Sequence, residues 1–296
     1  MTDADLHAPG ADLLGPEVLA RLERLQLGTR RKLAGRFSGE HRSRRYGTSL
    51  DFADVRDYHP GDDYRRIDYP LFARTDQLFV RLFDAEDDLD VRVVVDHSAS
   101  MATDDKLGTA ARLAAALGFV GLVRRDVVTV HAWPADVPPR RFAGRGAVGP
   151  LFTMLRELRP TGGTDLAAAA TAVLARTGPP GVTVLISDLL SPTWPAAIER
   201  LPGRGADVTV VHVLAPSDVE PGFDGDLELV DAETGERVVV SMTPDARSGY
   251  RAAVAAWLDD VEARCRRRGV GYVRVSTTDD VIDVVLRGWR DEGLLR

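Results

Sequence analysis

From residue 91 onward, short apolar runs alternate with longer stretches that carry apolar residues at helical spacing. The short runs are rich in valine and isoleucine, and they predict strands at residues 91–95, 127–132, 182–187, 208–214 and 272–275. The stretches between and after them predict helices at residues 106–125, 150–158, 166–176, 194–201, 244–268 and 281–289. Because strands and helices alternate, the sequence predicts an α/β fold with a mostly parallel sheet flanked by helices and joined by right-handed crossovers.

Two regions depart from this alternation. Residues 227–230 and 237–240 are β-type runs around a Thr-Gly turn, and they predict a β-hairpin inserted near residues 216–244. Before residue 91, leucines at helical spacing predict a helix at 16–35, and alternating residues near 78–83 indicate a strand. We therefore expect an N-terminal helix and β-containing segment over residues 1–90, packed on an α/β domain over residues 91–296.

Oxygen-bearing side chains follow the two most apolar strands. The first strand ends in Asp96, Ser98 and Ser100, the strand at 182–187 is followed by Asp188, and Thr164 follows a glycine pair in a loop that opens a helix. Ligands of open α/β sheets bind at the carboxyl ends of strands, and hard divalent cations prefer oxygen donors. Helix capping is the simpler alternative, but capping needs only one such residue. The pattern favours a site for Mg²⁺ or Mn²⁺.

The Asp-x-Ser-x-Ser motif at 96–100, with Thr164 and Asp188 in that order, resembles the metal-ion-dependent adhesion site of von Willebrand factor A domains. This resemblance implies a von Willebrand factor A-like, Rossmann-like fold. It also implies that Ser98, Ser100 and Thr164 bind the ion directly, and that Asp96 and Asp188 act largely through water. An acidic residue of a protein partner would then complete the coordination.

A second motif precedes the first predicted strand. It resembles the bacterial domain of unknown function 58 family, which is associated with MoxR-type AAA+ ATPases, and its residues here are Gly61, Asp62, Asp63, Arg65, Ile67, Asp68, Tyr69 and Arg74. The family usually has tryptophan where this chain has Tyr69. The carboxylates suggest acid–base chemistry or a second metal, but the interspersed arginines favour structural ion pairs.

Charge and composition limit the classes of partner and the cellular compartment that we expect. Thirty-eight basic and 45 acidic residues give a net charge of −7, which argues against a general nucleic-acid binder. Basic residues crowd positions 30–45, and they form either a solvated surface or a contact for an acidic partner or for phosphates. The single cysteine, Cys265, excludes an internal disulfide. The start of the chain lacks a secretory pattern and the longest apolar run is short, so we expect a cytoplasmic protein without a membrane span.

Two functions compete on this sequence. The first is a non-enzymatic, metal-dependent protein–protein interaction module, which the resemblance makes an adaptor for a MoxR-type ATPase and its client. The second is a metal-dependent hydrolase that uses the same ion, with Asp165 or His97 as the nearby general base. Neither residue has an evident orienting partner in the sequence, so we expect binding rather than catalysis.

Overall fold

The computed structural model describes residues 13–25, 27, 52–60, 62, 64–83, 89–134, 138–175, 181–203, 206–223, 225–285 and 289. The chain forms two compact units, one from Met1–Ala34 together with Leu89–Arg296, and the other from Gly35–Asp88. The N-terminal helix therefore groups with the α/β unit. That residues 1–90 form one segment packed on the core stays a prediction.

A six-stranded sheet forms the centre of the larger unit. Its strands, in spatial order, are β10 (Gly271–Ser276), β7 (Asp207–Leu214), β6 (Val182–Ser187), β3 (Asp90–Asp96), β4 (Val127–Trp133) and β5 (Arg140–Ala143). All neighbours are parallel except β4 and β5. The predicted mostly parallel sheet is thus confirmed. The edge strand β5 was not predicted, because its sequence, Arg-Arg-Phe-Ala, buries only Phe142 and has no apolar run.

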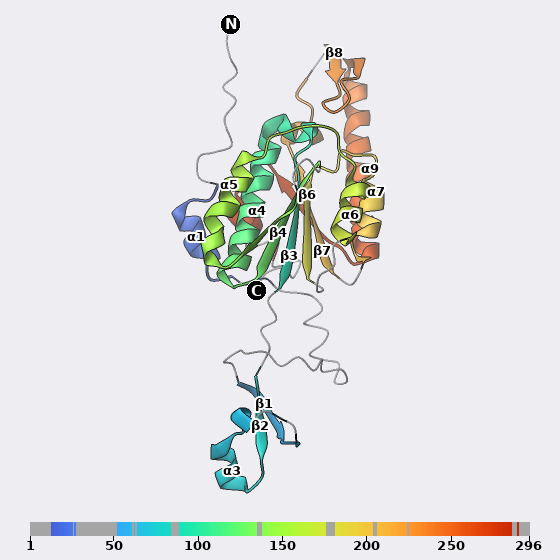
Figure 1. Ribbon diagram of the computed structural model, residues 1–296. Helices are drawn as coiled ribbons and strands as arrows, with labels where there is room; N and C mark the ends of the chain where they lie inside the picture. The colour runs from blue at the N-terminus through green and yellow to red at the C-terminus, as the bar shows by residue number, and fades with distance from the viewer. Residues whose placement is uncertain are drawn as a thin grey trace. The chain divides into compact units, whose positions relative to one another are not determined.

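Helices cover both faces of this sheet (Figure 1). One face carries α1 (Pro16–Leu22), α4 (Lys106–Val123) and α5 (Val148–Glu157). The other carries α6 (Leu166–Ala175), α7 (Trp194–Arg200) and α9 (Pro244–Arg268). Except for α1, these bounds lie within a few residues of the predicted helices. The flanking helices are those that a buried parallel sheet requires on its two apolar faces.

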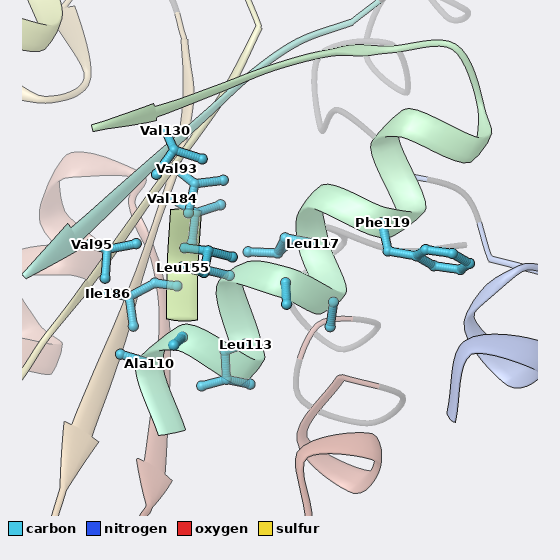
Figure 2. Packing of buried hydrophobic residues seen from close by; sticks show 14 of the residues in the cluster. Val93, Val95, Ala110, Leu113, Leu117, Phe119, Val130, Leu155, Val184 and Ile186 are labelled. Atoms are coloured by element: carbon cyan, nitrogen blue, oxygen red, sulfur yellow. The ribbon is translucent and has the colours of Figure 1, made fainter. Parts of the chain in front are cut away.

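The largest core lies between the sheet and α4. Figure 2 shows Leu117 of α4 pointing toward Leu155 and the strand valines, whereas Phe119 points the other way, toward the N-terminal segment. An 18-residue window within Ala99–Val123 has a mean hydropathy of 1.4, and the segment is long and apolar enough to cross a membrane by length and composition alone. In this fold 89% of that window is buried, because the sheet, α1 and α5 pack around it.

Two predicted helices are shorter in the structure. The helix expected at 16–35 ends at Leu22, because the chain turns there so that Leu25 and Leu27 also enter the core; residues 28–35 lie outside the described part. The helix expected at 281–289 is seen as α10 (Val281–Asp283), and Trp289 is buried. Short helices precede or follow the strands at η2 (Ala99–Asp105), η3 (Arg145–Ala147) and α8 (Pro216–Val219).

The expected hairpin is present. Strand β8 (Gly225–Val230) pairs antiparallel with β9 (Arg237–Met242) in a two-stranded sheet of its own. Gly235 adopts a φ of 72° in the connecting turn, where a side chain would be strained. Figure 1 shows β8 beside one end of α9, away from the strands of the main sheet.

The smaller unit pairs β1 (Phe52–Asp57) antiparallel with β2 (Phe79–Phe83). Between them lie η1 (Tyr64–Arg66) and α3 (Tyr69–Thr75). The alternating pattern near 78–83 is thus a strand, and it buries Val80. Strand β1 was not predicted, since its sequence mixes charged and apolar residues.

Candidate functional site

The direction in which the strands are added reverses between β3 and β6. From β3 the chain crosses to β4 on one side, and it later enters β6 on the other side. Ligands of α/β sheets bind outside the carboxyl ends of strands at such a reversal of strand order. Val95 pairs with Ile186, so Asp96 ends its strand beside Ser187 and Asp188.

Asp96 is the centre of the cluster and is buried. Its Oδ1 atom accepts hydrogen bonds from the Ser98 amide at 2.9 Å and from the Thr164 hydroxyl at 3.3 Å. Its Oδ2 atom accepts one from the Ser187 hydroxyl at 2.6 Å. Burial raises the pKa of Asp96 to about 6, and the negative charge of Asp188 acts in the same direction, while the bonds from Ser187 and Ser98 oppose both.

The hydroxyl oxygens of Ser98 and Ser100 lie 3.0 Å apart. Ser98 stands at the N-cap position of η2 without a side-chain capping bond, and the N-cap of α4 is Asp105. The Ser98 hydroxyl therefore caps no helix. This weakens helix capping as the explanation of the Asp-x-Ser-x-Ser motif.

The loop at 161–164 is fixed against the loop that follows β3. The Ala99 amide donates to the Gly162 carbonyl at 3.0 Å, and the Thr161 amide donates to the His97 carbonyl at 2.8 Å. The Ser191 hydroxyl also donates to the Thr164 carbonyl, at 2.7 Å. These bonds hold the Thr164 hydroxyl next to Asp96.

Asp188 is buried and engaged by other partners. Its Oδ2 atom lies 2.8 Å from the ammonium of Lys106, and its Oδ1 atom accepts from the Leu190 amide at 3.1 Å. Its carbonyl oxygen lies 2.9 Å from Nε2 of His212. Burial lowers the pKa of His212 to about 4, so this ring is neutral near pH 7 and its Nε2–H donates to that carbonyl.

The structure thus links four of the five predicted ligands directly: Asp96, Ser98, Ser100 and Thr164. Asp188 stands close enough for its charge to act on Asp96, but its own bonds go elsewhere. Within the described ranges, no group of three or more His, Cys, Asp or Glu side chains gathers to hold a metal ion. A metal at this cluster would depend mainly on hydroxyl oxygens, and its presence stays a prediction.

Three residues that sequence reasoning did not single out complete the cluster. Ser187 bonds to Asp96, Lys106 neutralises Asp188, and His212 positions the Asp188 carbonyl. Each is a polar residue inside or at the edge of a mostly apolar element, namely β6, α4 and β7. That interruption is the signal that points to them, because buried polar side chains need specific partners.

In the smaller unit, the two described carboxylates of the motif have local partners. Asp62 forms a two-bond ion pair with Arg56, at 2.6 and 2.7 Å, and accepts from the His59 amide. The hydrogen bonds from Arg56 are the main reason that the pKa of Asp62 falls to about 2. Asp68 caps α3 through the Leu71 amide at 3.0 Å.

The other motif residues in this unit differ in exposure. Ile67 bridges to Val80 in β2, Tyr69 begins α3 and is 58% exposed, and Arg74 lies exposed in its last turn. The Arg65 guanidinium lies 5.8 Å from the Tyr64 ring centroid. Gly61 and Asp63 lie outside the described residues.

Comparison with known proteins gives the family. The family described as "Protein of unknown function DUF58" matches residues 54–259, which span both compact units. The chain belongs to the DUF58 family. Among its relatives are the uncharacterized proteins Rv1480 of Mycobacterium tuberculosis (strain H37Rv) and Mb1516 of Mycobacterium bovis, each 32% identical over 302 residues, covering 96% of this chain and 93% of the relative.

Solved structures resemble this DUF58 member more distantly. A conserved hypothetical protein BatB from Bacteroides thetaiotaomicron is 16% identical with a TM-score of 0.44, covering 69% of this chain and 98% of that one. An aerotolerance-related membrane protein from Bacteroides fragilis is 17% identical with a TM-score of 0.45 and the same coverages.

Proposed function

We propose that this DUF58 protein is a metal-dependent protein-binding module with a von Willebrand factor A-like site. The observation that carries the proposal is the linked set of oxygens at the carboxyl ends of β3 and β6, drawn from Asp96, Ser98, Ser100 and Thr164. These residues would hold Mg²⁺ or Mn²⁺, and the bound ion would supply a positive charge for an acidic side chain of a partner.

The donor set fits a small hard cation. Neighbouring ligands of an octahedral Mg²⁺ site with bonds of about 2.1 Å lie about 3 Å apart. The Ser98 and Ser100 hydroxyl oxygens are 3.0 Å apart. Asp188 has both carboxylate oxygens in hydrogen bonds to Lys106 and the Leu190 amide, which favours contact with an ion through water. A cation held mostly by neutral hydroxyls keeps charge available for an incoming carboxylate.

The described contacts favour binding over hydrolysis. A hydrolase would need a general base near the ion, and the two candidates were Asp165 and His97. Asp165 Oδ1 accepts from the Ala168 amide at the start of α6. Both ring nitrogens of His97 face backbone carbonyls, those of Arg159 at 2.9 Å and Pro134 at 3.1 Å. One carboxylate oxygen of Asp165 and both ring nitrogens of His97 thus have backbone partners, which argues against a general-base role.

We further propose a MoxR-type AAA+ ATPase and its client as the partners, with this protein as the adaptor that joins them in assembly or maturation. This part rests on the resemblance of the 61–74 motif to its family. We propose a cytoplasmic location, since a single free cysteine, buried in α9, is compatible with a reducing compartment.

Calorimetry with Mg²⁺ and Mn²⁺ tests the metal site. The double variant Ser98→Ala with Ser100→Ala should lose binding. The matched control is Ser276→Ala with Thr278→Val, which removes another hydroxyl pair, 2.8 Å apart, from the end of β10. Unchanged metal affinity in the first variant, or no binding by the wild type, would refute the proposal. A pull-down with a MoxR-type ATPase in Mg²⁺ and in EDTA then tests the partner.

A further inference from the structure

The tip of the β8–β9 hairpin reaches the loop that contributes Thr164. The Thr164 amide donates a hydrogen bond of 2.9 Å to Oε2 of Glu233. That oxygen lies so close to Gly163 that a Cβ atom there would be 3.3 Å away, so glycine keeps the approach open. A carboxylate from a distant segment is thus seated on a backbone amide beside the candidate metal ligands.

Thr164 connects the two places. Its hydroxyl donates to Asp96, and its amide donates to Glu233. The described carboxylates of Glu233, Asp96 and Asp188 do not gather into one metal-binding group. The partner that the structure gives the Glu233 carboxylate is thus the Thr164 amide.

The turn that carries Glu233 is rigid on its own account. Asp231 Oδ1 accepts hydrogen bonds from the Glu233 and Thr234 amides, each at 2.8 Å. The Asp231 amide donates to the Glu236 carbonyl at 2.8 Å, which closes the turn. The side chain of Glu233 is therefore presented by a preformed tip, with little ordering needed on contact.

Only one oxygen of the Glu233 carboxylate has a described hydrogen bond to the loop at 161–164. Its Oε1 atom is buried and has no hydrogen-bond partner among the described residues. Strands β8 and β9 are mostly exposed, with Val239 at 76%, and they form no part of the main sheet. Since a buried acceptor without a donor is costly, a competing carboxylate with a better set of contacts can replace Glu233.

We propose that the Thr164 amide and the space over Gly163 form a carboxylate-binding subsite, which Glu233 fills in the free protein and which an acidic side chain of a protein partner takes over. The inference rests on the proposed function, because a partner's acid that displaces Glu233 from the amide would also gain contact with the bound ion. The hairpin is thereby an internal competitor that lowers the apparent affinity for a partner's carboxylate.

The first experiment tests the internal contact without metal. Hydrogen exchange of the Thr164 amide is measured in the full-length wild type, in Glu233→Gln and in the control Glu236→Gln. The control removes the same charge from the same turn, at an exposed residue. We expect faster exchange in Glu233→Gln alone, because an amide side chain loses the charge that strengthens the hydrogen bond. Equal exchange in all three proteins would overturn the contact, whatever the metal does.

The second experiment tests displacement with a defined probe. N-acetyl-glutamate methylamide is titrated into each Mg²⁺-saturated protein, and the Thr164 amide is followed by NMR. We expect at least about tenfold tighter binding to Glu233→Gln than to the wild type, equivalent to about 1.4 kcal/mol, and no gain in Glu236→Gln. Equal affinity in the three proteins, or no binding to Glu233→Gln, would overturn the subsite. Mg²⁺ isotherms recorded first show separately whether the metal site itself fails.

Discussion

The ammonium of Lys106 lies 2.8 Å from Oδ2 of Asp188, and both side chains are almost completely buried. A second carboxylate, that of Asp218, lies 3.4 Å from the same nitrogen. The first residue of α4 is therefore tied by charge to Asp188, directly after β6, and to Asp218 in α8. This pair holds Asp188 beside Asp96, because the ammonium balances a carboxylate that would otherwise repel its neighbour.

Removing this ammonium should destabilise the fold. We expect Lys106→Met to lower the free energy of unfolding by about 3–5 kcal/mol, since it leaves a buried carboxylate uncompensated. Urea unfolding measures the loss. Replacing Asp188 by leucine in the same protein should restore part of it. The control is Arg112→Met, whose partner Asp105 is exposed, with an expected cost below about 1 kcal/mol. If the Lys106→Met protein is as stable as the control, Lys106 does not stabilise the fold by compensating the buried charge of Asp188.

Ser187 should matter for metal binding although it is not a predicted ligand. Its hydroxyl donates to Asp96 Oδ2 at 2.6 Å, and this bond lowers the pKa of Asp96. We expect Ser187→Ala to weaken Mg²⁺ binding by about tenfold or more, the usual effect of losing a group that orients a ligand. Calorimetry near pH 7 gives the affinity. The control Thr183→Val removes a buried hydroxyl near the other end of β6, and it should bind as the wild type does. Equal Mg²⁺ affinities in both variants would show that the Ser187 hydroxyl does not support metal binding.

The pair between Arg56 and Asp62 predicts a pH dependence in the smaller unit. The pKa of Asp62 falls from 3.8 to about 2 in the fold. A lowered carboxyl pKa means that the unfolded state binds more protons between these values. The contribution of Asp62 is thus complete above pH 3.8 and is lost as the pH falls through about 2.

Hydrogen exchange of residues 52–83 at several pH values tests this. At pH 5 the wild type should be better protected than Asp62→Asn, and the difference should disappear toward pH 2. Asp57→Asn, an exposed change in β1, is the control and should follow the wild type. A constant difference from pH 5 to pH 2 would show that the carboxylate charge is not the cause.

Gly181, directly before β6, has no room for a side chain. A Cβ atom there would lie 2.0 Å from the carbonyl oxygen of Asp90, at the start of β3. Gly181→Ala should therefore push the two central strands apart at one end and cost about 1–3 kcal/mol, as overpacking does. Gly146→Ala is the control, because nothing lies within 4 Å of its Cβ position. Urea unfolding compares the two, and equal stability would mean that the strands adjust freely.

The sequence predicted the sheet and most of the cluster for the same reason. Apolar strands that end abruptly in oxygen-bearing residues indicate both the core and its polar edge, and the parallel pairing then brings the strand ends together. Asp96 and Ser98 are also close in sequence, so their contact is local. Thr164 required only that its loop lie at the same edge, and the structure places it there.

The partners that were missed are far apart in the sequence. Lys106 and Asp188 are separated by 82 positions, and Glu233 and Thr164 by 69. No short-range pattern encodes such pairs, because which loop faces which depends on strand order and hairpin geometry. A lysine that starts an apolar helix and a glutamate in a turn both look like ordinary surface residues until the fold gives each a partner.

The packing of α4 has a consequence for how the protein is made. Its core contains Leu113 and Leu117 together with Val211, Val213 and Val275, which come much later in the chain. During synthesis this apolar helix therefore leaves the ribosome well before the last strands that share its core exist. A nascent chain at that stage exposes the surface that chaperones bind and that drives aggregation. Ribosome stalling or premature termination between β4 and β10 would consequently yield a chaperone substrate and not a partly active protein.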